Sequence, residues 1–323
     1  MINIHRRVPS AILCILLCFA TAPSPSYAIR ASHSSKQRHL SLQKTSETSK
    51  TDILATIVTS VPRGGGDVDK SSLSSLLLQP ELASKATPAL LGLLSLHALF
   101  DTKRHMEALF KVSYDDKLSR RELLFASSVI VKLVGLYSLQ KFGNLPFDRA
   151  LGYSFLPFFP LYLYMIFDID PFPINHKVGG LIIDACIAVA GLTRECVIFP
   201  DRRLSSWMFK AYGFGTLLGG IQYLVQPSKV YQNADIVTPS PASLQMARIT
   251  GACLVMHGVM VVSQTIRGIP YLQADPSFGY GLLAFATSLA WLVGAQKMPL
   301  FDGKAFLVTG AVYTWAAASL ILG

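Results

Sequence analysis

The chain has few charged residues, and it has fewer acids than bases. Charged residues make up 15% of its 323 residues, against about 25% in an average soluble domain. Asp and Glu together number 19, while Lys and Arg number 29. Even a 300-residue domain leaves about a quarter of its chain surface in water, so a composition this low in charge argues against an ordinary soluble globule. It also excludes intrinsic disorder, which requires low hydrophobicity and high charge.

Cysteine is scarce as well, with five residues, and two of them, Cys14 and Cys18, lie near the N-terminus. The others show no C-x-x-C or His–Cys spacing, which excludes a disulfide scaffold and a zinc ribbon. The sequence also lacks a nucleophile elbow, a zinc-protease histidine pair, a dinucleotide-binding glycine fingerprint and an RNA-binding motif. We therefore expect no nucleic-acid partner and no cofactor, and we attribute the net charge of +10 to membrane interfaces.

Apolar residues are abundant and gather in long runs. They make up 51% of the chain, and the mean hydropathy is +0.42. Most runs are close to the roughly 20 residues that a spanning helix needs. The eight runs cover residues 84–100, 122–140, 149–167, 178–199, 207–226, 246–266, 277–296 and 304–322. Since backbone groups in lipid must be paired within the segment, these runs predict an all-α polytopic membrane protein with about eight transmembrane helices.

The first 80 residues have the composition of a targeting segment. Residues 1–28 predict a signal peptide, with a basic start, a short apolar core and Ser26-Tyr27-Ala28 as the cleavage site. Residues 29–80 predict a disordered linker whose first part is basic, Ser-rich and free of acids, like a transit peptide. The whole segment resembles the bipartite leaders of algae with secondary plastids, which implies a plastid membrane. A plain leader to the secretory pathway or an endomembrane, and an uncleaved anchor, are the alternatives.

The apolar part of the chain repeats itself. Residues 148–158 align with residues 275–285, and the same offset places Lys177 on Lys304. A nearly equal offset places Lys132 on His257. These matches predict two tandem four-helix units, 81–200 and 201–323, with chance similarity between apolar helices as the alternative. An even number of helices keeps both units in one orientation, related by an axis along the membrane normal.

A short motif carries a family resemblance. Arg248 opens an apolar helix that bears Gly251, after a long loop containing proline. This arrangement resembles small four-helix membrane proteins of the DoxX-like kind, here duplicated in tandem. The resemblance implies a helical membrane architecture and no particular chemistry.

Four ionisable residues within these runs form the candidate intramembrane polar site: Lys132, Asp184, His257 and His97. Such a side chain costs about 2.5–3.5 kcal/mol on insertion scales, so each requires a partner or a role. Pairing of Lys132 with Asp184 would offset most of this cost. The pair then serves one of two roles: it lines a pathway for a proton or a small solute, or it holds the helices together. The two histidines are also compatible with haem, but each helix carries only one, so we expect packing histidines.

The segment after the third run contains the only candidate metal ligands, Asp168, Asp170 and His176. Carboxylates in this pattern are suited to Mg²⁺ or Mn²⁺. Because no third acid completes a diphosphate-binding cluster, we expect hydrated side chains in an interfacial turn and no metal. The loop 101–121 mixes apolar and basic residues, which predicts either an amphipathic helix that binds anionic lipid headgroups or a solvated loop.

Two functional hypotheses follow. The favoured one is a non-enzymatic multi-pass membrane protein that acts as a small-solute or proton carrier or as a membrane scaffold. The alternative is a membrane-embedded redox or transferase enzyme that uses the histidine or Asp-Asp positions. A carrier requires Lys132, Asp184 and His257 to face one cavity, whereas an enzyme requires the residues of the candidate metal site to converge beside a pocket.

Overall fold

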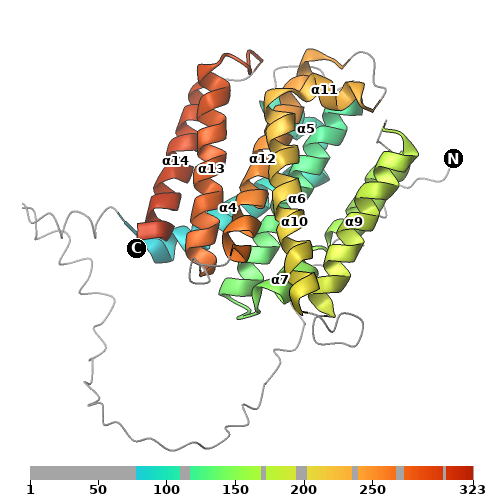
Figure 1. The fold of residues 1–323 in the computed structure, drawn as a ribbon. Helices are drawn as coiled ribbons and strands as arrows, with labels where there is room; N and C mark the ends of the chain where they lie inside the picture. Colours follow the sequence, from blue (N-terminus) through green and yellow to red (C-terminus); the bar gives the residue numbers. More distant parts are fainter. Residues whose placement is uncertain are drawn as a thin grey trace, which may run out of the picture. The chain divides into compact units, whose positions relative to one another are not determined.

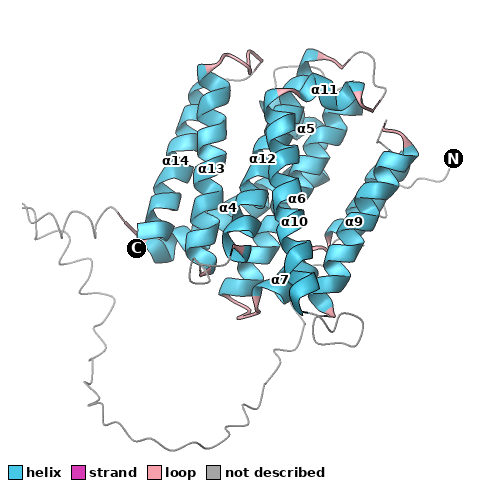
Figure 2. Cartoon of the chain, in the orientation of Figure 1, coloured by secondary structure: helices cyan, strands magenta, loops and turns pink. Residues whose placement is uncertain are grey.

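The computed structural model describes residues 78–109, 117–168, 172–193, 202–234, 239–266, 273–300 and 303–322. The predicted signal peptide, 1–28, and nearly all of the predicted linker, 29–80, lie outside these ranges. Within them the chain forms helices and no strands (Figure 2), which confirms the predicted all-α class.

The described helices follow the apolar runs of the sequence (Figure 1). They are α4 (Pro80–Phe100), α5 (Thr102–Leu109), α6 (Lys117–Lys141), α7 (Phe147–Ser154), α8 (Phe158–Asp168), α9 (Ile174–Leu192), α10 (Arg202–Val225), α11 (Pro227–Gln232), α12 (Pro241–Thr265), α13 (Ala274–Gly294) and α14 (Gly303–Leu322). Five of them, α4, α6, α12, α13 and α14, are long and apolar enough to cross a membrane.

The third apolar run is not the single continuous helix that the sequence predicted. It is divided into α7 and α8 by a turn over residues 155–157. The reason is Pro157, which has no backbone N–H and whose ring collides with the carbonyl four residues earlier. The turn is instead closed by shorter-range bonds from the N–H groups of Phe155 and Leu156 to the carbonyls of Gly152 and Tyr153. By contrast, Pro88 lies inside α4 without interrupting it.

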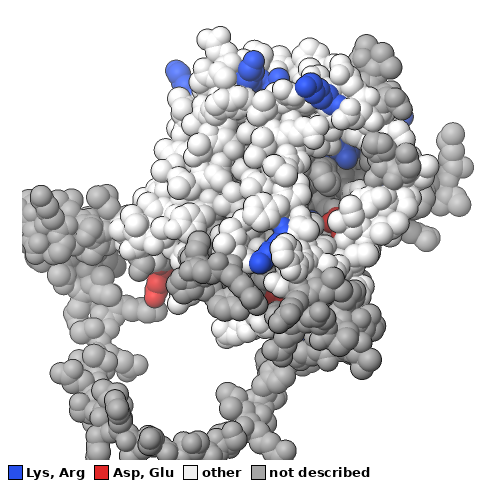
Figure 3. Space-filling model, in the orientation of Figure 1, with Lys and Arg blue, Asp and Glu red and all other residues white. Residues whose placement is uncertain are grey.

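The segments between the long helices alternate between the two ends of the bundle. In Figure 1, α5, α11 and the connection from α13 to α14 lie at the upper end, and α7 lies at the lower end. Lys and Arg side chains gather at the upper end in the face drawn in Figure 3.

Helices α6 and α12 pack against each other in parallel. At their N-terminal ends the hydroxyls of Ser119 and Ser243 lie 3.0 Å apart. Toward their C-terminal ends the side-chain amides of Gln140 and Gln264 exchange hydrogen bonds of 2.6 and 3.1 Å. Both pairs are separated by 124 positions in the sequence. The helices therefore keep one register over their whole length.

Glycines allow α10 and α12 to approach closely. A Cβ atom at Gly220 would lie 2.7 Å from the backbone nitrogen of Val255, and one at Gly251 would lie 2.5 Å from that of Leu224. Side chains at these positions would push the helices apart, which is why small residues suit close helix contacts in membranes.

Candidate functional site

A cavity of about 720 Å³ lies among α6, α8, α9, α10 and α12, and we call it the large cavity. Its wall is mostly apolar, and its polar and charged lining residues are Arg121, Lys132, Tyr162, Asp184, Tyr212, Thr216 and Tyr223. Figure 3 shows a hollow in the face of the molecule between the helices labelled α9 and α10 in Figure 1, with a basic and an acidic side chain at its edge.

Two glycines of α10 leave the large cavity open. Gly215 and Gly219 line it, and a Cβ atom at either position would meet no atom within 4 Å. Their neighbours Gly213 and Gly220 instead face α12, where a Cβ atom would collide. The glycine-rich stretch of α10 therefore serves helix packing on one side and cavity space on the other.

Lys132 is buried in the wall of this cavity, with only 4% of its surface exposed. Its ammonium group donates a hydrogen bond of 2.7 Å to the Tyr212 hydroxyl. It also lies over the rings of Phe155 and Phe158, at 4.3 and 4.7 Å from their centroids. The turn at Pro157 brings both rings to this position. Cation–π contacts and a hydrogen bond together stabilise a cation that would otherwise be costly to bury.

Tyr212 joins Lys132 to His257. Its hydroxyl lies 3.1 Å from Nε2 of His257, which is fully buried. Lys132 donates to the hydroxyl oxygen, and the direction of the hydrogen bond between this hydroxyl and Nε2 depends on which ring nitrogen of His257 carries the proton. Nδ1 has no hydrogen-bond partner among the described residues. Lys132, Tyr212 and His257 thus form a buried chain of hydrogen-bonded ionisable groups, which we call the polar chain.

Asp184 faces the same cavity from α9. In the described part of the chain it makes no direct ion pair with Lys132. The structure thus brings three of the four residues of the candidate polar site to one place, with Lys132 and Asp184 in the cavity wall and His257 behind Tyr212.

His97 lies elsewhere, near the C-terminal end of α4. Its Nδ1 is 2.9 Å from Nδ1 of His105 in α5. Partial burial lowers the pKa of His105, and the neighbouring His97 lowers it further. The pair belongs to the contact between α4 and α5 and does not line the large cavity.

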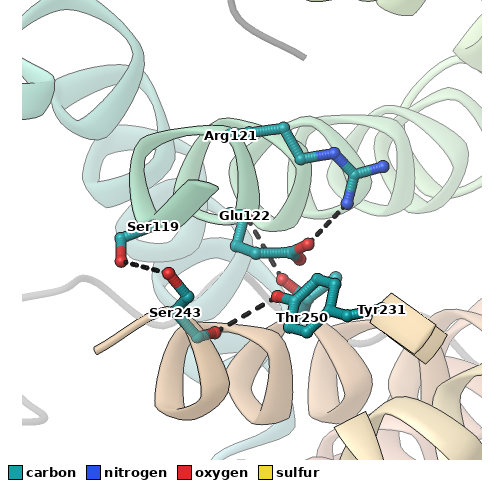
Figure 4. A network of polar contacts seen from close by, with 6 residues as sticks. All are labelled: Ser119, Arg121, Glu122, Tyr231, Ser243 and Thr250. Carbon is teal, nitrogen blue, oxygen red and sulfur yellow. Dashed lines mark hydrogen bonds and ion pairs between the residues drawn. The ribbon is translucent and has the colours of Figure 1, made fainter. Parts of the chain in front are cut away.

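A second polar cluster joins the N-terminal ends of α6 and α12 to α11 (Figure 4). Arg121 and Glu122 form a buried ion pair with N–O distance 2.6 Å. The Arg121 guanidinium also lies over the rings of Phe125 and Phe172, at 4.8 and 4.4 Å.

Hydrogen bonds extend this cluster across the helices. The Thr250 hydroxyl donates to the backbone carbonyl of Glu122, and the Tyr231 hydroxyl donates to that of Ser243. Burial and the nearby Glu122 carboxylate raise the pKa of Tyr231 far above its usual value. The cluster fixes the ends of three helices beside the large cavity.

The candidate metal residues cannot be placed as a site. Asp170 and the side chains of Asp168 and His176 lie outside the described residues. Among the side chains that are described, no group of three His, Cys, Asp or Glu residues is placed to hold a metal ion.

The sequence did not single out Tyr212 or Glu122. Tyrosine is common in membrane helices, so Tyr212 gave no signal until the fold placed it between Lys132 and His257. Glu122 stands at the start of its apolar run, where a charge is unremarkable.

The chain matches no protein-family model, no curated protein and no solved structure.

Proposed function

We propose that this chain is a non-enzymatic integral membrane protein that carries protons and small solutes through the large cavity. The observation that carries the proposal is the polar chain, Lys132–Tyr212–His257, which begins in the cavity wall beside Asp184. Ionisable groups buried in membrane helices are characteristic of proton relays and solute pathways.

The cavity also has the size of a ligand site. Small-molecule pockets measure about 300–1,000 Å³ and combine apolar walls with a few convergent polar groups. At about 720 Å³, the large cavity lies within that range. A scaffold needs neither the cavity nor two titratable groups in its wall, which favours a carrier.

The proposal includes two four-helix units, α4 to α9 and α10 to α14, with all long helices in the membrane. It is supported by the self-matching contacts of α6 and α12, in which residues separated by 124 positions meet at both ends. Because this separation is one residue less than the offset that aligns Lys132 with His257, the contacts join nearly equivalent positions of the two units, as expected for an axis along the membrane normal. Lys132 and His257, which the repeat aligns, meet at Tyr212, so the polar chain lies close to this axis.

Proton flux into vesicles tests the function. We expect proteoliposomes of the full chain, loaded with a pH-sensitive dye and clamped at zero potential, to equilibrate an imposed pH gradient faster than protein-free vesicles. Asp184→Asn removes the carboxylate of the cavity wall, and Tyr212→Phe removes the hydroxyl that joins Lys132 to His257. Each substitution is expected to slow the flux at least tenfold, roughly the loss of one essential transfer group.

Two substitutions outside the cavity serve as controls. Asp101→Asn changes an acid after α4, where the new side-chain oxygen still accepts from the N–H of Arg104. Tyr153→Phe removes a hydroxyl from an exposed tyrosine of α7. Both should retain wild-type flux. Flux equal to that of empty vesicles in the wild type, or unchanged flux in Asp184→Asn and Tyr212→Phe, would reject the carrier function.

A further inference from the structure

The wall of the large cavity holds two charges of opposite sign that are not paired with each other. The Lys132 ammonium and the Asp184 carboxylate both line it. Within the described residues they form no ion pair at 4.0 Å or less, yet they lie close enough for their charges to attract each other. Arg121, the other charged residue of the wall, is paired with Glu122. The wall therefore presents one cation and one anion that are held apart.

The Lys132 ammonium has hydrogen-bond donors to spare. An ammonium group carries three N–H donors. Among the contacts of the described chain, the Tyr212 hydroxyl uses one of them. The rings of Phe155 and Phe158 stabilise the charge through their faces and leave the other donors without an oxygen or nitrogen acceptor. Two donors therefore remain for an acceptor that enters the cavity.

Asp184 has the complementary requirement. Its carboxylate makes neither a hydrogen bond nor an ion pair with any other described residue. A carboxylate only accepts hydrogen bonds, and a wall that includes Phe125, Val129 and Ile187 offers it no donor from these side chains. Leaving such a group without donors is costly. The cavity thus combines a donor-rich cation, an acceptor-only anion and apolar surface.

From this arrangement we infer that the large cavity binds a small zwitterion with an apolar side chain, of the class of the apolar α-amino acids. Its carboxylate lies at Lys132, its ammonium group lies at Asp184, and its side chain lies against the apolar wall. A zwitterion pairs both charges of the wall, whereas a ligand with one charge pairs one of them and leaves the other unpaired. The inference rests on the proposed function, because it names the class of solute that the carrier takes.

Equilibrium binding of radiolabelled L-phenylalanine tests this site. The full chain is purified in dodecyl maltoside, whose uncharged headgroup pairs with neither charge of the wall. We expect saturable binding of one phenylalanine per chain. The competitors are 3-phenylpropionate, which lacks the ammonium group, phenethylamine, which lacks the carboxylate, and glycine, which lacks the apolar side chain. Each should compete at least tenfold more weakly, because the first two leave a buried charge unpaired and glycine buries little apolar surface.

Two substitutions assign each charge of the wall to a group of the ligand. In Asp184→Asn the ligand's ammonium group loses its counter-charge, so phenylalanine and 3-phenylpropionate should bind about equally. In Lys132→Gln the ligand's carboxylate loses its counter-charge, so phenylalanine and phenethylamine should bind about equally. Asp101→Asn and Lys103→Gln change charges outside the cavity wall and should keep the wild-type selectivity. Partial unfolding would weaken all ligands alike and would not exchange their order.

A pair of glycine variants locates the ligand in the cavity. Gly215→Leu fills the large cavity at a position where added atoms meet open space, and it should weaken phenylalanine binding at least tenfold. Gly310→Leu in α14 is the matched control, because a Cβ atom there also meets nothing within 4 Å and the residue does not line the cavity. Gly219→Leu repeats the steric test if Gly215→Leu fails to fold.

Several results would overturn the inference. They are phenylalanine binding that does not saturate, equal competition by 3-phenylpropionate or phenethylamine in the wild type, unchanged selectivity in Asp184→Asn, and equal binding in Gly215→Leu and Gly310→Leu. Displacement of phenylalanine by dihexanoyl phosphatidylcholine at equal concentration would also overturn it, because the zwitterion that the cavity takes would then be a lipid headgroup.

The two proposals fail separately. Loss of specific phenylalanine binding with intact proton flux rejects the zwitterionic solute alone. Specific phenylalanine binding in a protein that conducts no protons rejects the proton-carrier function and leaves a membrane protein that binds a zwitterion.

Discussion

Lys132 shows what single residues of this sequence reveal and what they conceal. Its position inside an apolar run made it a candidate, since a buried ammonium group requires compensation. The compensating groups were not predictable, because Phe155, Phe158 and Tyr212 are ordinary residues of apolar segments until the fold gathers them. The cost of burying a charge therefore indicates where a site lies. Which residues surround the charge depends on contacts between helices that are far apart in the sequence.

Arg121 and Glu122 provide a stability prediction at the same scale. Arg121→Met leaves Glu122 buried without its counter-charge, and we expect the free energy of unfolding to fall by about 3–5 kcal/mol. The double variant Arg121→Met/Glu122→Leu removes both charges and should recover most of this loss. Thermal unfolding in detergent, read as loss of helical circular dichroism, compares the three proteins. A double variant as unstable as Arg121→Met would contradict the proposed role of the ion pair.

At the scale of helices, the apolar runs predicted where helices lie but not whether each run forms one continuous helix. The eight apolar runs all contain helices, and the predicted start of the first run at residue 84 lies within four residues of Pro80. Pro157 divides the third run, whereas Pro88 does not interrupt the first. Proline marks a place where a helix loses a hydrogen bond, and the packing around it decides whether the helix ends there.

The adjacent glycines of α10 predict opposite effects of one substitution. Gly220→Ala places a methyl group 2.7 Å from the backbone of α12, so we expect a loss of about 1–3 kcal/mol as the helices separate. Gly219→Ala points into open space and should stabilise the protein by up to about 1 kcal/mol, because alanine favours helix more than glycine. Melting temperatures of the two variants in the same detergent check this. Equal destabilisation by both would contradict the close packing of α10 on α12.

For the whole molecule, the repeat in the sequence and the contacts between α6 and α12 both concern how the two halves of the chain pack together. The offset that aligns Lys132 with His257 differs by one residue from the separation of the Ser119–Ser243 and Gln140–Gln264 contacts. Sequence alignment alone does not indicate which helices of the two halves touch, because every apolar helix presents similar side chains. The pairing of α6 with α12 is therefore a property of the fold that only the three-dimensional structure reveals.

Disulfide cross-linking tests this central pairing. In a chain whose five cysteines are replaced, Ser119→Cys/Ser243→Cys places two thiols where the hydroxyls now lie 3.0 Å apart, and we expect this pair to form an intramolecular disulfide on mild oxidation. In Gln140→Cys/Gln264→Cys the thiols replace longer side chains that meet at their amide ends, so we expect this pair to be joined by a short bifunctional thiol reagent. Both products are detected by mass spectrometry of peptides from the monomer band. Ser119→Cys/Gln264→Cys joins opposite ends of the two helices and should not cross-link. Because antiparallel helices would link this control pair and neither of the others, the three variants distinguish a parallel pair around a two-fold axis from the opposite arrangement.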